Sequence, residues 1–256
     1  MEGAPKMYEQ ELKLAITAAQ AAGSFLRERK DIHIDKLEGK DIKLSSDKQS
    51  EQIIFNILEE SRIPILSEEA GFVGIEGEFC WIVDPIDGTI NYFKGLDDFS
   101  CVSIALCKNE TPILGVVYRF KTDELFYGIN GQGAFKNNQP ISPSLIEDIS
   151  QAIVATGFPV KRNYSFDSLK QFIIQIQSFK KVRMLGSAAL MCTFVATGTV
   201  EAYMEDEIML WDVAAAKAIV EAAGGVTYIK LLDDNKCIFK AFSNKKLMED
   251  YYAKII

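Results

Sequence analysis

The segment DPIDGT at residues 84–89 places two carboxylates, a hydroxyl and a glycine in one short turn. The apolar run at 79–83 predicts a strand that brings Asp84 to the edge of a sheet. Asp87 follows three residues later, so both carboxylates can converge on one point. The glycine and threonine that come next are expected to open a helix, whose free N–H groups suit an anion. Hard oxygen ligands beside a phosphate cradle favour Mg²⁺.

Other acidic residues stand where predicted elements begin or end. Asp47 precedes one helix, Asp212 begins a helix of small residues, and the acidic pair that starts with Glu68 follows a short apolar run. Each has an ordinary structural explanation, because aspartate caps helices and acidic pairs are common in solvated loops. Asp84 and Asp87 are likewise common turn formers, and Asp87 could be an N-cap. The residues alone therefore leave both a metal site and a set of turns and caps open.

The charge balance and the histidine count narrow the chemistry. The 256 residues carry a formal net charge of −8, and basic residues gather only in short pairs, which argues against a nucleic-acid polymer as partner. A chain this acidic repels an anionic substrate unless a bound cation reverses the local field. The one histidine, His33, lies in a polar stretch that we expect to be exposed, so Ser-His-Asp catalysis and multiple-histidine metal sites are nearly excluded. Carboxylates, hydroxyls and the backbone must supply the chemistry.

Composition and cysteine spacing indicate a cytoplasmic protein without a membrane partner. Apolar residues make up 48% of the chain and charged residues 25%, an ordinary globular balance. No apolar run approaches the roughly 20 residues that span a membrane, and the polar first residues contain no signal-peptide core. The five cysteines are widely spaced without a CxxC pair, so we expect buried reduced thiols and neither a zinc site nor a disulfide framework.

Apolar periodicity predicts the elements of the N-terminal part. A helix is expected at about 7–28, followed by a hairpin or loop at 31–43. A second helix follows, where Ser46 and Gln49 have the spacing of a capping box. Strand-like runs separated by turn residues between 101 and 136 predict an antiparallel meander.

The pattern changes near residue 145. We expect an N-terminal lobe at about 1–145 with an antiparallel sheet and a C-terminal α/β lobe at about 146–256, joined without a flexible linker in a single domain. The second lobe is predicted to contain strands at 153–156, 200–204, 226–231 and 239–242, and helices at 166–179, 188–197 and 213–223.

Two longer motifs resemble the signatures of the inositol monophosphatase family of lithium-sensitive, magnesium-dependent phosphatases. They are WIVDPIDGTINY at 81–92 and LWDVAAAKAIVEAAGG at 210–225. The resemblance runs in order from about residue 10 to 245, so it covers nearly the whole chain. It implies an α+β fold, the layered α-β-α-β-α sandwich of the sugar phosphatases, as one domain over 1–256. Further matching segments are SSDKQSEQ, ILSEEAG, GVVY, GQGAF, TGFP and GSAAL.

The resemblance implies two to three Mg²⁺ ions. Glu68, Asp84 and the carbonyl of Ile86 would hold the first ion. Asp84, Asp87 and Asp212 would hold the second. A third, weaker ion would contact Glu68 through water.

The same resemblance assigns the catalytic group. Asp47 and Thr89 would orient the attacking water, with Glu68 beside them. Of the two acidic residues, Glu68 is expected to bind the metal directly, and Glu69 would contact the groups around it. The backbone of Gly88 and Thr89 would hold the phosphate. No covalent enzyme intermediate is needed, which agrees with the near absence of histidine. The substrate-binding residues implied are Asp87, Gly88, Thr89, Ala188, Glu205 and Asp212.

Substrate identity rests on fewer residues. Glu205, seven positions before Asp212, stands where the inositol-cleaving members have a glutamate that contacts substrate hydroxyls, and Ala188 would line the same pocket. The alternative for Glu205 is an exposed charge at a strand end. Two departures from the family pattern are Ala215, where glycine is common, and Tyr92, which is expected to alter the pocket slightly.

The leading function is Mg²⁺-dependent hydrolysis of a small polyol or sugar phosphate, with inositol 1-phosphate first. One alternative is a 3′(2′),5′-bisphosphate nucleotidase or a fructose-1,6-bisphosphatase. Another is a catalytically silent, metal-binding regulatory protein, against which the intact ligand set argues. The resemblance also implies a homodimer and inhibition by lithium.

Overall fold

The computed structural model describes residues 7–28, 33–38, 41–158 and 163–255 of the chain. No helix in these segments is both long and apolar enough to cross a membrane. The α-helices are α1 (Glu9–Glu28), α2 (Ser45–Leu58), α3 (Thr89–Lys94), α4 (Phe166–Ile176), α5 (Ala188–Ala196), α6 (Leu210–Ala222) and α7 (Lys245–Ile255).

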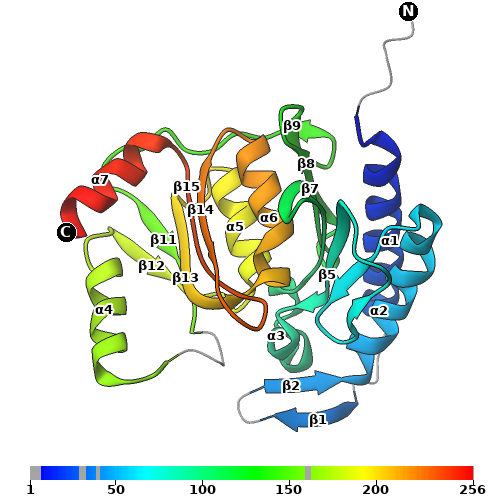
Figure 1. Ribbon diagram of the computed structural model, residues 1–256. Coiled ribbons are helices and arrows are strands. Elements are labelled where there is room, and N and C mark those ends of the chain that lie inside the picture. Colours follow the sequence, from blue (N-terminus) through cyan, green and yellow to red (C-terminus); the bar gives the residue numbers. More distant parts are fainter. Residues whose placement is uncertain (1–6, 29–32, 39–40, 159–162, 256) are drawn as a thin grey trace, which may run out of the picture.

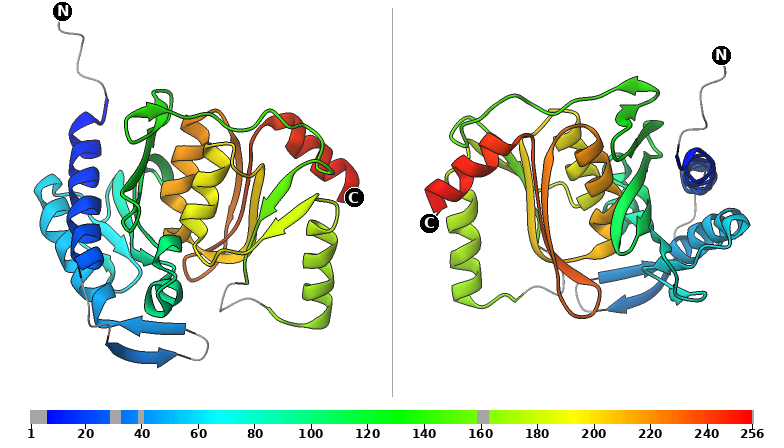
Figure 2. Two further views of the ribbon diagram at one scale, coloured as in Figure 1. Left: turned by 180° about the vertical axis from the view of Figure 1, so that it is seen from behind. Right: turned by 45° about the horizontal axis from the view of Figure 1, so that its top comes forward.

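The helices and two large sheets alternate in five layers (Figures 1 and 2). Helices α1 and α2 cover the outer face of an eight-stranded sheet. Helices α5 and α6 lie between this sheet and a five-stranded one, and α4 and α7 cover the far face of the second sheet. The layered α-β-α-β-α architecture predicted from the sequence is confirmed.

The larger sheet is mainly an antiparallel meander. Its strands are β3 (Ile65–Ser67), β4 (Gly71–Val73), β5 (Phe79–Asp87), β6 (Cys101–Lys108), β7 (Thr111–Arg119), β8 (Glu124–Ile129), β9 (Gly133–Lys136) and β10 (Gln139–Pro140). From β5 to β10 each strand pairs antiparallel with the next, as predicted, while β3 runs parallel to β5. The carboxyl ends of β3 and β5 therefore lie at the same edge.

The smaller sheet mixes parallel and antiparallel pairs. Its strands are β11 (Ile153–Ala155), β12 (Lys181–Arg183), β13 (Ala202–Met209), β14 (Val226–Leu231) and β15 (Lys236–Phe242). They lie in the order β12-β11-β13-β15-β14, with β11 parallel to both neighbours. A separate hairpin of β1 (Ile34–Glu38) and β2 (Asp41–Leu44) precedes α2. It confirms the hairpin reading of this polar stretch.

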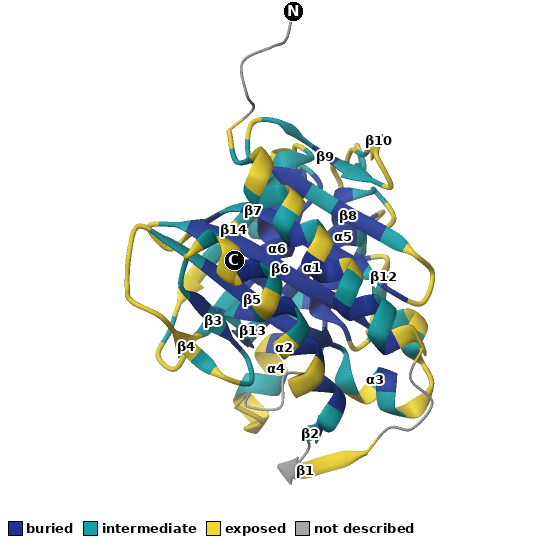
Figure 3. Ribbon diagram, turned by 90° about the vertical axis from the view of Figure 1, so that its right-hand side faces the viewer, coloured by how far each residue is buried: buried dark blue, intermediate teal, exposed yellow. Residues whose placement is uncertain are grey.

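Three apolar cores fill the spaces between the layers, and Figure 3 shows that most of the central strands β5 and β6 is buried. One joins α1 and α2 to the larger sheet around Trp81 and Ile54. A second surrounds α5 and α6 between the sheets and includes Tyr203. The third lies between the smaller sheet and its outer helices and includes Phe242. Fully burying one such side chain contributes about 1.5–3 kcal/mol, so these cores hold the layers in fixed relative positions.

Helix α6 lies unusually close to the larger sheet. Most of its residues are apolar and buried, as expected for a helix between two sheets. A β-carbon at Gly115 of β7 would lie 2.0 Å from the carbonyl oxygen of Ala215. Glycine on the sheet side therefore provides the space for the backbone of α6 at Ala215. The close approach also fixes Asp212, in the first turn of α6, relative to the sheet.

The predicted capping box of α2 is wrong. The helix begins at Ser45, so Ser46 lies inside its first turn, and its hydroxyl has no hydrogen-bond partner among the described residues. The N-cap is Leu44, whose N–H donates to Asp47 Oδ2 at 2.6 Å. A carboxylate on the third helical residue thus satisfies the end of the helix in place of a serine.

All five cysteines are free thiols. Four of them are buried, as predicted, while Cys80 is half-buried. His33 is exposed, as expected from its polar surroundings.

Candidate active site

A cavity of about 460 Å³ opens where β5 ends and where α3, α5 and α6 begin. A larger cavity of about 740 Å³ lies between α4 and α7 and contains none of the predicted site residues. The smaller cavity is therefore the candidate site. Its lining includes these predicted residues: Glu68, Asp84, Ile86, Asp87, Gly88, Thr89, Ala188, Glu205 and Asp212.

Strand β5 presents Asp84 and Asp87 at its carboxyl end, where its register against β6 shifts between them. Both side chains are buried. Asp84 Oδ1 accepts the N–H of Ile86 at 3.0 Å. Ser50 of α2 donates its hydroxyl to the Pro85 carbonyl at 2.9 Å. The turn that the sequence singled out is thus fixed both by its own carboxylate and by the neighbouring helix.

Asp87 is held by the N-terminus of α5. Its carboxylate accepts hydrogen bonds from Ser187 Oγ at 2.6 Å, from the Ala189 N–H at 2.7 Å and from the Ala188 N–H at 3.2 Å. Burial raises the pKa of Asp87 to about 6, and these hydrogen bonds limit the rise. Sequence reasoning named Ala188 but missed Ser187. A serine directly before an apolar helical run is an N-cap signal that could have found it.

Gly88 links this strand to α3 as the N-cap of the helix, with φ of 86°. A β-carbon there would also lie 2.7 Å from the Phe99 carbonyl oxygen, so both the backbone conformation and the space require glycine. The expected helix at Gly88 and Thr89 is confirmed, although it is only six residues long.

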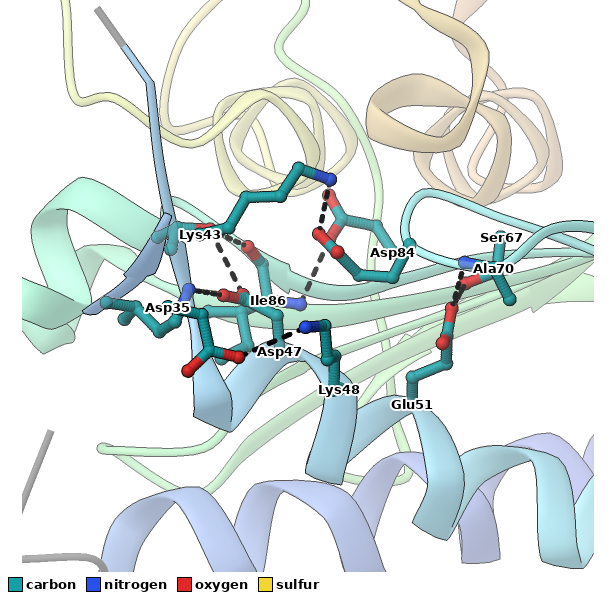
Figure 4. Close-up of polar contacts among 12 residues, drawn as sticks. Asp35, Lys43, Asp47, Lys48, Glu51, Ser67, Ala70, Asp84 and Ile86 are labelled. Atoms are coloured by element: carbon teal, nitrogen blue, oxygen red, sulfur yellow. Dashed lines mark hydrogen bonds and ion pairs between the residues drawn. The ribbon is translucent and has the colours of Figure 1, made fainter. Parts of the chain in front are cut away.

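Asp47, in the first turn of α2 (Figure 4), lies beside Thr89. Thr89 Oγ1 lies 3.4 Å from Asp47 Oδ1 and 2.9 Å from the Ile86 carbonyl oxygen. The hydroxyl has a single proton, and the shorter contact is the one to Ile86. Burial raises the pKa of Asp47 to about 7, while the Leu44 N–H acts in the opposite direction. The predicted pair is therefore adjacent, with a long contact between its members.

The two acidic residues after β3, Glu68 and Glu69, have different contacts. The N–H of Glu68 donates to the Val83 carbonyl at 3.3 Å, which places this residue beside β5, and its side chain lines the cavity. Glu69 Oε1 forms an ion pair with Lys43 Nζ at 2.8 Å. Lys43 comes from β2 and also lines the cavity, a contribution that the sequence reasoning missed. That Glu68 is the metal ligand stays a prediction, which the ion pair of Glu69 favours.

Asp84 and Asp212 are destabilised as anions by their surroundings. For Asp84, burial raises the pKa well above its ordinary value, and Glu68, Asp87 and Asp212 raise it further. For Asp212, burial again contributes most, followed by Asp87, Glu68 and Glu205. These carboxylates, from β5, α6, β13 and the loop after β3, thus lie close enough to repel one another.

The donor chemistry of the cavity fits divalent cations. Asp84 and Asp87 are buried and Asp212 is half-buried, and Lys43, which also lines the cavity, already forms an ion pair with Glu69. With Glu68 the three aspartates offer only hard oxygen donors, which Mg²⁺ prefers. Within the segments that the structure covers, however, no three Asp, Glu, His or Cys side chains already surround one point. Side-chain rotations would be needed to gather these donors around an ion.

Glu205 is buried and faces the cavity, so the alternative of an exposed strand-end charge is wrong. It lies at a bulge of β13, where the register against β15 shifts between Glu205 and Ile208. Glu207, two residues later, is less buried and forms an ion pair with Lys236 at 3.9 Å. At this bulge Glu205 is buried, whereas Glu207, which also lines the cavity, is half-buried.

Tyr92 does not reach the cavity. Its ring is buried against Phe120, and its hydroxyl donates to the Leu26 carbonyl at 2.9 Å. The expectation that Tyr92 alters the pocket is wrong, because the side chain points from α3 toward α1.

The sequence matches a model of the inositol monophosphatase family over residues 7–234. Inositol monophosphatase 3 of Solanum lycopersicum is 38% identical over 232 residues, which cover 86% of each chain. A protein of Aquifex aeolicus named fructose-1,6-bisphosphatase/inositol-1-monophosphatase is 35% identical over 257 residues, or 95% of this chain and 94% of the relative. The solved structure of inositol monophosphatase from Anabaena (Nostoc) sp. PCC 7120 has a TM-score of 0.84 at 32% identity, covering 96% of this chain and 95% of that one. The family model, the sequence relatives and the solved structure therefore point to the same family.

Proposed function

This chain belongs to the inositol monophosphatase family of phosphoric monoester hydrolases, and from that membership we propose that it uses Mg²⁺ to hydrolyse inositol 1-phosphate. The observation that carries the metal dependence is the gathering of three aspartates around one cavity, the buried Asp84 and Asp87 and the half-buried Asp212. Each of these acids has a raised pKa. A dianionic phosphate could not enter such surroundings without cations to compensate the charge.

We propose the ligands in two sets. Glu68, Asp84 and the Ile86 carbonyl would hold one ion, and Asp84, Asp87 and Asp212 would hold another. A third ion would contact Glu68 through water. When bound, the ions would neutralise phosphate charge, lower the pKa of the attacking water and stabilise the leaving oxygen.

Asp47 and Thr89 would orient the water. Its oxygen would form a bond to phosphorus as the bond from phosphorus to the polyol oxygen breaks, and the polyol oxygen would take a proton from a solvent water. Asp47 would accept the released proton through the Thr89 hydroxyl, which would turn from the Ile86 carbonyl toward Asp47 to pass it on. The N–H groups of Gly88 and Thr89, at the start of α3, would hold the phosphate.

The substrate proposal rests on Glu205 and Ala188. Both line the cavity, whose volume of about 460 Å³ suits a small metabolite. A buried glutamate is an acceptor for the hydroxyl groups of a polyol. The name of the Aquifex relative favours fructose 1,6-bisphosphate as a second candidate. A 3′(2′),5′-bisphosphate nucleotide is the third.

A phosphate-release assay on these three substrates tests the proposal. We expect activity with Mg²⁺, its loss with EDTA, and the highest kcat/KM on inositol 1-phosphate. Absence of EDTA-sensitive release from every monoester would overturn the proposed chemistry. A higher kcat/KM on either bisphosphate would overturn only the choice of substrate.

Asp84→Asn separates an enzyme from a silent metal-binding regulator. The substitution keeps the size of the side chain and its hydrogen bond to Ile86, so the fold should persist. We expect turnover to be abolished. A biological role that survives unchanged in the variant would favour the regulatory alternative.

A homodimer, lithium inhibition and a cytoplasmic location stay predictions. Sedimentation of the purified protein tests the first, titration of Li⁺ against Mg²⁺-driven activity tests the second, and fractionation of cells tests the third.

A further inference from the structure

One face of α2 contacts three segments of the candidate site. Asp47, Ser50 and Glu51 are spaced so that they share this face, and all three are buried. Asp47 lies beside Thr89, and Ser50 donates to the Pro85 carbonyl. Glu51 contacts the third segment, the loop of the acidic pair. The resemblance to known motifs assigned a role to Asp47 alone.

Glu51 accepts hydrogen bonds from two residues of this loop, one before and one after Glu68 (Figure 4). Its Oε1 accepts a short hydrogen bond from Ser67 Oγ and a second one from the Ala70 N–H at 3.0 Å. Ser67 ends β3, so these two contacts span the residues that carry the acidic pair. Glu51 itself is 8% exposed. Burying a carboxyl group costs free energy unless it is hydrogen-bonded. The hydrogen bonds from Ser67 and Ala70 therefore stabilise both the Glu51 side chain and the loop.

We propose that Glu51 is a positioning residue that fixes the loop of Glu68 and thereby sets the affinity of the site for Mg²⁺. The proposal rests on the proposed function, because it takes Glu68 as a ligand. Its physical reason is that a ligand on a short loop must be held within a fraction of an ångström, which requires partners behind it. Glu51 reaches no part of the cavity lining, so it acts through the loop.

The test compares four variants with the wild type. Glu51→Ala removes both contacts, and Ser67→Ala removes one. Glu51→Gln keeps an acceptor oxygen, and since both donors use Oε1, one amide oxygen can retain both. Ile54→Val, a fully buried position of the same helix, is the matched control, because it loosens packing without touching the loop.

Two readouts are independent of turnover. Isothermal titration calorimetry gives the Mg²⁺ dissociation constant, and hydrogen exchange of the metal-free protein reports the Ala70 N–H. We expect Glu51→Ala to weaken Mg²⁺ binding by about 10- to 100-fold, the usual range for a partner behind a ligand, and to speed exchange at Ala70. Ser67→Ala should show a smaller loss, and Glu51→Gln should recover most of the affinity. Ile54→Val should lower the melting temperature and leave the affinity unchanged.

Several outcomes would overturn the proposal. Wild-type affinity in Glu51→Ala is one, and if that variant does not fold, wild-type affinity in Ser67→Ala is the equivalent. An equal loss of affinity in Ile54→Val would make the effect a general consequence of lower stability. If the wild type itself binds no Mg²⁺, the proposed function falls first and the positioning role falls with it.

Discussion

Helices α2 and α6 begin in the same way. Each has an extended apolar residue as N-cap, Leu44 in one and Met209 in the other. Each carries an aspartate on its third residue that takes a backbone hydrogen bond from that N-cap, Asp47 from Leu44 and Asp212 from Met209. The expectation that either aspartate is an N-cap is therefore wrong: each lies on the third helical residue and accepts the N–H of the N-cap.

The two aspartates differ in what surrounds the helix. Helix α2 belongs to an outer layer, and Asp47 has the Lys43 ammonium among the groups that lower its pKa. Helix α6 lies between the sheets, and Asp212 faces Asp87, Glu68 and Glu205. The comparison teaches that one local cap can serve two purposes. Under the proposed function, burial and neighbouring charges decide whether the carboxylate would accept a proton, as at Asp47, or bind a metal, as at Asp212.

The largest expected effect is the loss of turnover in Asp212→Asn. Removing a ligand should cost more than the roughly 100- to 1,000-fold lost with one oxyanion-hole donor. Asp47→Asn should slow turnover by about 100-fold or more, as expected for a proton acceptor. Calorimetry should show weakened Mg²⁺ binding in Asp212→Asn and nearly unchanged binding in Asp47→Asn.

Stability of the metal-free protein is the control for this pair. Asparagine can still accept the N-cap N–H in both variants, so neither helix should fray. Asp212→Asn should raise the melting temperature at neutral pH, because it removes a half-buried acid whose pKa is raised by neighbouring carboxylates. A lower melting temperature together with unchanged Mg²⁺ affinity would mean that Asp212 is a cap alone.

The next effect is a dependence of metal-free stability on pH. The pKa of Asp47 is about 7 in the folded chain against an ordinary 3.8, so between these values the folded state binds more protons than the unfolded one. The free energy of unfolding should therefore fall as pH rises through this window, by up to about 4 kcal/mol. Urea titrations in EDTA from pH 4 to 7.5 measure it.

Asp47→Asn should remove part of this slope and leave the part due to Asp87, whose pKa is raised to about 6 with the same sign. Identical slopes in wild type and variant would contradict the raised pKa of Asp47.

The smallest effect concerns how each helix packs. Gly115→Ala would force a β-carbon against the backbone of α6 and should destabilise the protein by about 1–3 kcal/mol. Ile54→Val on α2 removes one methylene from side-chain packing and should cost about 0.5–1.5 kcal/mol. Chemical denaturation compares the two. A neutral Gly115→Ala would show that α6 can move away from the sheet without loss.

Local patterns predicted most elements but not those with weak periodicity or short length. The meander and helices α1, α5 and α6 follow from apolar spacing. Strands β4 and β12, of three residues each, were missed because they are too short to show an alternation. Helix α7 was also missed, although Asn244 caps it by accepting the Leu247 N–H at 2.9 Å. That signal was available in the sequence.

The sequence by itself determined the acidic residues of the site, their motifs and, through the resemblance, the family. It did not indicate which residues hydrogen-bond to these acidic residues and to the loop that carries Glu68. Glu51, Ser67 and Ser187 look like ordinary polar residues until the fold places them against the loop of Glu68 and the carboxylate of Asp87. Only tertiary structure turns Glu205 inward and Tyr92 away from the cavity. The physical reason is range: caps and periodicity act over a few residues, whereas burial and charge repulsion act between segments that meet only when the layers pack.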